Sequence, residues 1–182
     1  MNKSVWSLAL LASCAIAHPA SAELVLQSSD IHQGQMMPKA QEFQGFGCAG
    51  DNRSPALSWS GAPEGTKAYA LLVHDADAPT GSGWWHWQLI NIPAEVTSLA
   101  AGAGADGAEL PKGSQSMRND YGVYGFGGAC PPPGHGVHHY RFTLYALPAP
   151  LDLPKDASAA LTGYMVNGSA LASSTIEALY QR

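Results

Sequence analysis

The sequence predicts a mainly β protein with helices toward its C-terminus. It contains 20 glycines and 13 prolines among 182 residues, more than the roughly 12% that these two residue types contribute to an average protein. These turn residues separate short apolar runs, a pattern typical of strands joined by tight turns. Hydrophobic residues make up 46% of the chain, which is enough for a sizeable core and too much for a disordered chain.

The clearest strands lie in the middle and in the last third of the chain. Residues 68–73 form a near-continuous apolar run between turn signals, which indicates a strand buried on both faces. Residues 84–92 form a second strand that ends at a proline, and residues 138–147 form the clearest strand of all. Glycine and proline interrupt 24–61, which predicts loops between edge strands, whereas 100–116 predict an exposed loop.

Beyond residue 154 the pattern changes and predicts two helices. Asp156 is a suitable N-cap for a helix that reaches residue 161. The Asn-Gly pair at 167–168 predicts a break, after which the apolar residues of 169–180 predict a second helix. The sequence has no internal repeat and no linker long enough to separate domains, so we expect a single domain over 23–182.

Residues 1–22 have the three parts of a secretory signal peptide. A lysine near the start precedes an apolar stretch, and an Ala-x-Ala cleavage site stands at 20–22. A bacterial lipobox is the alternative, because Leu-Ala-Ser-Cys ends at Cys14, and lipidation there would tether the protein to a membrane. We prefer soluble export to the periplasm or the medium, because lipidation at Cys14 leaves the Ala-x-Ala site without a purpose.

The charge balance and the apolar pattern exclude two classes of partner. Lys and Arg total 9 against 14 Asp and Glu, which gives a net charge of -5, and no basic block is present. A protein that binds nucleic acid through its phosphates needs clustered Lys and Arg. No apolar stretch after residue 22 is long enough for a transmembrane helix.

Cys48 and Cys130 are the cysteines that remain after removal of the leader. Exported chains meet an oxidising environment, which favours a disulfide between these two residues. Two buried thiols that never meet are the alternative.

Two aspartates follow the strand predicted over 68–73. Strand alternation points Asp75 to the same side as Tyr69 and Val73, and therefore toward the core. Side chains at the end of a buried strand often form ligand sites. The alternative is a turn in which aspartates accept hydrogen bonds from nearby backbone N–H groups, and this describes Asp77 well.

His86 lies in the Trp-Trp-His-Trp segment over 84–87. Alternation places His86 on the face of Gln88, and it places Trp85 and Trp87 together on the opposite face. A histidine on a strand face is more often a core residue than a ligand. The clustered tryptophans indicate either the wall of a pocket or a dense core.

A Gly/Pro-rich loop over 127–136 precedes the strand of 138–147. Glycine permits close backbone approach in such a loop, and proline stiffens it. On the strand, alternation places His138 and Tyr140 on one face and His139 on the other. A histidine and a tyrosine at the polar end of an apolar face can donate hydrogen bonds to an anion. The histidines of this segment lack metal-ligand spacing, so we predict no metal site.

Four motifs stand in a fixed order along the chain: D-x-D-A-P at 75–79, H-W at 86–87, G-x-C-P-P-x-G at 128–134 and H-x-Y-x-F-x-L-Y-A-L at 138–147. Together they resemble the phosphatidylethanolamine-binding protein (PEBP) family, in its bacterial Raf-kinase-inhibitor-like branch. The resemblance covers nearly all of the chain after the leader. It implies a β-sandwich around a large antiparallel sheet, with C-terminal helices.

The resemblance also implies a small pocket that accepts phosphate, acetate or a phospholipid headgroup, with no cofactor and no metal. The matching ligand-binding residues are Asp75, His86, Gly128, Pro131, Pro132, His138 and Tyr140. Asp77 and Pro79 match structural positions, and the family has a cis bond before this proline, here Ala78–Pro79. The chain departs from the family at Ala76, where proline is usual, and at His139, where arginine is usual.

The residue chemistry agrees with an anion pocket. Two imidazoles and a phenol can donate to phosphate oxygens, and Asp75 can orient and charge a neighbouring imidazole. We therefore expect an exported, non-catalytic protein that binds a small anion, a phosphorylated ligand or a phospholipid headgroup. Two alternatives remain: a hydrolase that uses the same Asp and His side chains, and an interaction protein that inhibits a partner by occupying its phosphosite.

Overall fold

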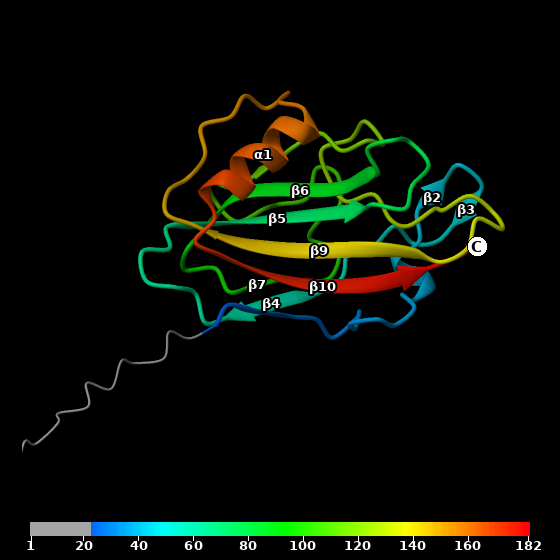
Figure 1. Ribbon diagram of the computed structural model, residues 1–182, viewed down its shortest axis with the longest axis horizontal. Helices are drawn as coiled ribbons and strands as arrows, with labels where there is room; N and C mark the ends of the chain where they lie inside the picture. The colour runs from blue at the N-terminus through cyan, green and yellow to red at the C-terminus, as the bar shows by residue number, and fades with distance from the viewer. Residues whose placement is uncertain (1–22) are drawn as a thin grey trace, which may run out of the picture.

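The computed structural model describes residues 23–182, so the predicted signal peptide and Cys14 lie outside the described residues. Its main element is a five-stranded antiparallel sheet in the order β10-β9-β5-β6-β8 (Figure 1). The strands are β5 (Ala68–Asp75), β6 (Trp84–Pro93), β8 (Gln115–Ser116), β9 (His138–Leu147) and β10 (Ala172–Tyr180). The expected large antiparallel sheet is confirmed.

Smaller elements accompany the main sheet. A three-stranded sheet has the order β1-β4-β7, and β2 pairs with β3 in a separate hairpin. Their bounds are β1 (Val25–Gln27), β2 (Gln44–Gly45), β3 (Cys48–Ala49), β4 (Leu57–Ser60) and β7 (Ser98–Leu99). A 3-10 helix (Lys39–Gln41) precedes the hairpin, and the α-helix is α1 (Ala159–Ser169).

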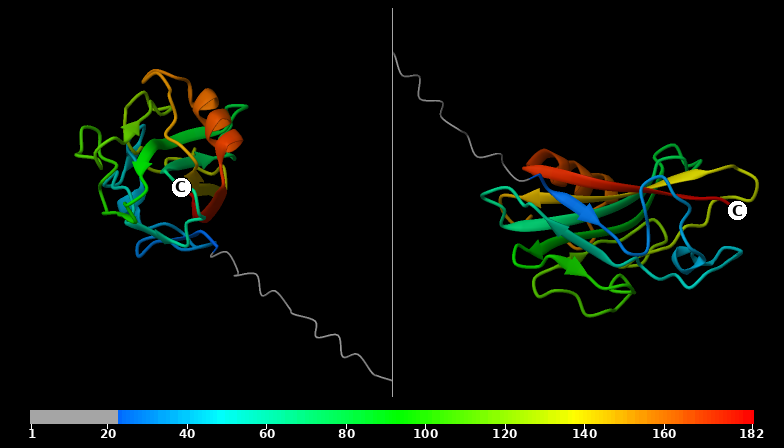
Figure 2. Two further views of the ribbon diagram at one scale, coloured as in Figure 1. Left: turned by 90° about the vertical axis from the view of Figure 1, so that its left-hand side faces the viewer. Right: turned by 90° about the horizontal axis from the view of Figure 1, so that it is seen from below.

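The main sheet is buried on both faces (Figures 1 and 2). On one face, Tyr69 and Leu71 of β5 pack in a cluster with Trp59 of the small sheet. On the other face, Leu72 of β5 packs in a second cluster with Val166 of α1. This layering explains why 68–73 is apolar at every position rather than at alternate ones.

The three strands expected in the middle and last third of the chain are confirmed. β5 and β6 each run slightly further than the apolar pattern indicated, and β9 has the expected bounds. The expected loop over 100–116 is correct except at its end, where β8 pairs with β6. The interrupted segment 24–61 contains short strands, in agreement with its turn residues.

The first C-terminal helix is present, but its boundaries differ from the prediction. Ser158, not Asp156, is the N-cap, and its side chain accepts a hydrogen bond from the backbone N–H of Leu161 at 3.1 Å. The break expected at 167–168 is wrong. The helix continues there because the Asn167 side chain donates to the Gly163 carbonyl one turn earlier, at 2.7 Å, instead of competing for the local backbone.

The second predicted C-terminal helix is wrong, because 172–180 form β10. This strand pairs with β9 over its whole length. Ile176 and Ala178 are buried in the cluster that contains the small sheet, whereas Thr175 and Glu177 lie outside it. A period of two with β-branched residues favours a strand when a partner strand stands beside it.

The turn after β5 also differs from what the resemblance implied. Every peptide bond within 23–182 is trans, including Ala78–Pro79. The chain turns here through hydrogen bonds instead. The backbone N–H of Asp77 donates to Asp75 Oδ1 at 2.9 Å, and the backbone N–H of Thr80 donates to the Ala78 carbonyl at 2.8 Å.

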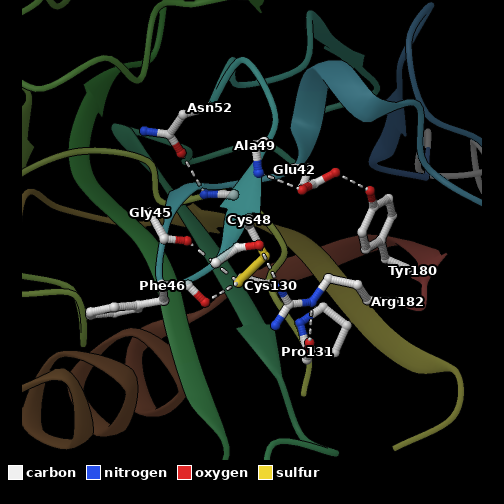
Figure 3. The surroundings of a disulfide bond; sticks show 12 residues. Glu42, Gly45, Phe46, Cys48, Ala49, Asn52, Cys130, Pro131, Tyr180 and Arg182 are labelled. Carbon is white, nitrogen blue, oxygen red and sulfur yellow. Dashed lines mark hydrogen bonds between the residues drawn. A yellow bond between two sulfur atoms is a disulfide. The ribbon is translucent and has the colours of Figure 1, made fainter. Parts of the chain in front are cut away.

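A disulfide joins Cys48 of β3 to Cys130, 82 positions further along the chain (Figure 3). It connects the β2–β3 hairpin to the Gly/Pro-rich loop before β9. Arg182 makes a second connection, because its Nε donates to the Pro131 carbonyl at 3.1 Å and its Nη1 to the Gly47 carbonyl at 2.7 Å. Both connections fix this loop beside the hairpin.

Candidate functional site

A β-bulge in β6 determines where His86 points. Val73 of β5 lies opposite Trp87 while His74 lies opposite Trp85, so His86 is an extra residue between two paired positions. The face assignment from simple alternation is therefore wrong. Trp85 packs on the α1 side and Trp87 on the side of the small sheet.

Gln88 confirms the change of face. Its side chain donates to the carbonyl of Ala159, the first residue of α1, at 3.1 Å. His86 lies instead on the opposite side of the sheet, where Tyr140 is 5.1 Å away between ring centroids. The bulge thus turns His86 toward β9 and away from the helix.

A cavity of about 200 Å³ lies at the ends of β5, β6 and β9. Its lining residues are Phe46, Asp75, Ala78, Pro79, Thr80, Trp84, His86, Tyr121, Cys130, Pro131, Pro132, His138 and Tyr140. The site residues expected from the sequence thus come together, with two exceptions. Asp77 and Gly128 do not line the cavity.

Asp77 supports the neighbouring strand instead. Its Oδ2 accepts from the backbone N–H of His139 at 2.8 Å and from His139 Nδ1 at 2.7 Å. The hydrogen bond from the His139 side chain is the main reason that the pKa of Asp77 lies below its usual value. His139 therefore faces away from the cavity, as alternation predicted.

Gly128 acts through its backbone, one layer behind the cavity wall. Its N–H donates to Asn52 Oδ1 at 2.7 Å, and its carbonyl accepts from the Tyr121 hydroxyl at 2.9 Å. A Cβ at this position would lie 2.3 Å from the Gln41 carbonyl oxygen, so only glycine fits here.

Asp75 and His138 form a buried pair at the base of the cavity. Both residues are almost completely buried, with 2% of Asp75 and 1% of His138 exposed. His138 Nδ1 donates to Asp75 Oδ2 at 2.7 Å. The other nitrogen of His138, Nε2, lies 2.8 Å from Nδ1 of His135 in the preceding loop. Asp75 thus fixes the His138 ring so that Nε2 points to the loop side of the site.

His86 has a different protonation state from the one expected. Its Nδ1 lies 2.7 Å from the Gly127 carbonyl oxygen, which can only accept, so Nδ1 carries the proton. Burial lowers the pKa of His86 from 6.5 to about 4, although the hydrogen bond to Gly127 and the charge of Asp75 oppose this shift. The ring is therefore neutral near pH 7, and its Nε2 is an acceptor rather than the expected donor.

An aromatic wall completes the cavity. Tyr121 stacks on Phe43 at 4.0 Å and lies 5.2 Å from Trp84 between ring centroids. Phe46 stacks on the same tyrosine at 5.8 Å and is 72% exposed at the mouth. Sequence reasoning noted the tryptophans but missed Tyr121 and Phe46, because both lie in irregular segments without a periodic signal.

Several polar atoms of the lining residues lack a partner. His86 Nε2, the Tyr140 hydroxyl and the Trp84 indole N–H are buried, and none makes a hydrogen bond within the described part of the chain. Burial and the charge of Asp75 raise the pKa of Tyr140, so its hydroxyl keeps its proton. A buried polar atom without a partner is costly, which indicates that a ligand or water completes these bonds.

Comparison with known proteins identifies the family. The sequence profile described as "Phosphatidylethanolamine-binding protein" matches residues 27–181. The chain belongs to the phosphatidylethanolamine-binding protein family. The resemblance noted from the motifs is thus confirmed, and it accounts for nearly all of the described residues.

Three relatives illustrate the range of this PEBP family. The UPF0098 protein YbcL of Escherichia coli K12 is 48% identical over 163 residues, which cover 88% of this chain and 89% of YbcL. Its crystal structure, described as that of a new member of the mammalian PEBP family, has a TM-score of 0.86 and covers 88% of this chain and 99% of that chain. The UPF0098 protein YbhB of the same organism is 42% identical, over 85% of this chain and 98% of YbhB.

A third PEBP relative carries a name that describes it as a lipoprotein. "Putative lipoprotein LppC" of Mycobacterium tuberculosis H37Rv is 42% identical over 142 residues, which cover 77% of this chain and 63% of LppC. Among residues 23–182, no helix has the length and apolar character needed to cross a membrane.

Proposed function

We propose that this PEBP-family protein is exported and binds a small anion, or the anionic group of a phosphorylated ligand, in the cavity formed by β5, β6 and β9. The observation that carries the proposal is the set of buried polar atoms on lining residues, His86 Nε2 and the Tyr140 hydroxyl, that lack a partner within 23–182. They stand beside the buried Asp75–His138 pair. A cavity of about 200 Å³ holds a phosphate-sized group.

The donors for such an anion come from β6 and β9. Tyr140 offers its hydroxyl and Trp84 its indole N–H, both buried. His138 can add its Nε2 as a donor only in the form that carries both ring protons, because its Nδ1 already donates to Asp75. His135 contacts the same Nε2 from an exposed loop, so an anion competes with His135 for His138 rather than with Asp75.

We propose binding without catalysis for this site. A hydrolase that works through a covalent intermediate needs an activated side-chain nucleophile beside its acid–base pair. Thr80 donates its hydroxyl to the Gly83 carbonyl, which leaves it poorly placed for attack. Burial raises the pKa of both Tyr121 and Tyr140, which keeps their hydroxyls protonated. Recovery of a phosphate monoester unchanged after incubation with the protein supports this reading, and its turnover favours the hydrolase.

Replacing His138 by alanine is expected to weaken phosphate binding about tenfold or more. The substitution removes a hydrogen bond with charge on at least one partner, worth roughly 1.5 to 3 kcal/mol. Titration calorimetry with inorganic phosphate measures the change. His139→Ala is the matched control, because His139 bonds Asp77 on the opposite face. Equal losses at 138 and 139, or no saturable binding by the wild type, contradict the proposed site.

Export rests on the leader over 1–22, and the disulfide supports it because such bonds persist in oxidising compartments. The protein from its native host is expected to begin at Glu23, and mass spectrometry of the N-terminal peptide measures this. A lipidated Cys14 as first residue favours a tethered form, in line with the name of the relative LppC. An intact Met1 contradicts both routes.

A further inference from the structure

We infer that the cavity selects an oxyanion that carries its own acidic O–H, such as hydrogen phosphate or the monoanion of a phosphate monoester, over an oxyanion without one, such as sulfate. This inference rests on the proposed function and names the class of anion that the same site accepts. Its basis is the orientation of the His86 ring, whose Nδ1 donates to the Gly127 carbonyl at 2.7 Å.

The orientation fixes which nitrogen of His86 is free. A carbonyl oxygen only accepts, so the proton of the neutral ring must be on Nδ1, and Nε2 then carries a lone pair. His86 is 2% exposed, and its Nε2 has no partner within 23–182. Nε2 is therefore a buried acceptor on a residue that lines the cavity, and a ligand that displaces water from it must supply a donor.

The surroundings of His86 keep it in this state. The titratable groups around it are Asp75, His138 and Tyr140, which line the same cavity, and Tyr121 in the loop after β8. His74 on β5 acts only through its charge, because its ring packs on Trp85 on the other side of the sheet. The carboxylate of Asp75 carries the negative charge beside His86, and both of its oxygens already accept hydrogen bonds. One accepts from His138 Nδ1 and the other from the backbone N–H of Asp77. Burial outweighs the attraction of this carboxylate and keeps the pKa of His86 low.

The remaining groups define the rest of the ligand. Tyr140 and Trp84 supply an O–H and an N–H that lack partners within the described residues, so they require acceptors. One small group must therefore offer acceptors and a donor together. A P–OH group beside P–O oxygens does so, whereas sulfate and ionised carboxylates offer acceptors alone and an ammonium group offers donors alone. The negative charge of Asp75 further disfavours an anion that is fully ionised.

Titration calorimetry with inorganic phosphate and with sulfate, at equal ionic strength near neutral pH, tests the inference directly. Phosphate is expected to bind at least about tenfold more tightly than sulfate. Sulfate binding that equals or exceeds phosphate binding overturns the inference and leaves the proposed anion site intact. If neither ion binds, the proposed function fails and the inference fails with it.

A His86→Leu variant links this selectivity to the ring. Leucine keeps apolar volume and removes the acceptor, so the ratio of phosphate to sulfate affinity is expected to fall close to one. His74→Leu is the matched control, because His74 is the neighbouring histidine on β5 and does not line the cavity. An unchanged ratio in a folded His86→Leu variant, with circular dichroism as the check of folding, overturns the inference.

The pH dependence of the wild type tests the inference without any variant. The affinity for methyl phosphate is expected to fall about tenfold per pH unit above the second pKa of the ester, about 6, because its monoanion disappears. Sulfate keeps one charge state in this range, so its affinity should stay nearly constant. Parallel curves for the two ions mean that the protein titrates instead of the ligand, and this overturns the inference.

Phosphoethanolamine separates the two possible sources of a donor. It carries both an ammonium group and a phosphate monoester, whereas methyl phosphate carries the ester alone. Similar affinities for the two compounds support the P–OH group as the donor to His86. Binding of phosphoethanolamine without binding of methyl phosphate assigns the donor to the ammonium group and overturns the inference.

Discussion

Replacing both Cys48 and Cys130 by alanine is expected to lower the free energy of unfolding by about 4 kcal/mol. The disulfide joins residues 82 positions apart. In the chain-entropy account, a cross-link that closes about 80 residues contributes about 4.5 kcal/mol by restricting the unfolded chain, although measured values are often smaller. Domains of this size are stable by only about 5 to 15 kcal/mol, so the bond supplies a large share of the total.

Guanidinium denaturation followed by tryptophan fluorescence measures this loss. Each single variant, Cys48→Ala or Cys130→Ala, already breaks the bond and is expected to lose about as much as the double variant. Reduction of the wild type should give a similar midpoint. A loss below about 1 kcal/mol in the double variant contradicts the prediction, because changes of that size are ordinary for single substitutions.

The same bond shapes the mouth of the cavity. Cys130 lines the cavity directly, and Phe46 lines it from the hairpin that Cys48 holds in place. The backbone of Phe46 has a φ of 52°, a conformation that costs free energy for a residue other than glycine. The hairpin therefore depends on its connections to the loop before β9, and weaker phosphate binding should accompany the loss of stability.

Strict alternation explains why β5 and β9 could be assigned from the sequence. Asp75 follows the buried side of β5, and His138 and Tyr140 share one side of β9, as their spacing indicated. Alternation failed at His86 because the bulge inserts one residue into β6. A one-residue shift exchanges the two faces of a strand. No residue type in this segment predicts a bulge.

The C-terminal segment shows how tertiary contacts override a local pattern. The apolar residues of 169–180 suggested a helix, but β9 offers an edge along which the whole of β10 pairs. Arg141 and Glu177, on opposing positions of these strands, also form an ion pair at 2.9 Å. Neither the free edge of β9 nor this cross-strand ion pair can be predicted from the sequence before the order of the strands is known.

The aromatic wall was missed for a related reason. Tyr121 lies in an irregular segment and is fixed by stacking on Phe43 and by its hydrogen bond to the Gly128 carbonyl. Phe46 reaches the cavity through a hairpin that a distant disulfide holds. Both positions result from contacts between segments far apart in the sequence. The spacing of residues along the chain therefore cannot predict these positions.

Acid is expected to destabilise the protein through His86. Burial lowers the pKa of this ring from 6.5 to about 4 in the folded protein, whereas the unfolded chain keeps a value of about 6.5. Above about pH 6.5 both states are neutral, so the contribution of His86 to stability is fully present there. As the pH falls from about 6.5 to about 4, the unfolded state takes up a proton that the folded state does not, and about 3 kcal/mol of stability is lost.

Denaturation curves for the wild type and for His86→Leu, each at about pH 7 and at about pH 4, measure this loss. The acid-induced drop in the free energy of unfolding is expected to be about 3 kcal/mol smaller in the variant, which has no ring to protonate. His32→Gln is the control, because it removes an exposed histidine and should leave the drop unchanged. If His86→Leu folds less stably at neutral pH, the comparison still holds, since each protein serves as its own reference. An equal drop in both proteins would show that folding does not lower the pKa of His86, so the ring would be charged below about pH 6.5 and its Nε2 would there be a donor to an anion in the cavity.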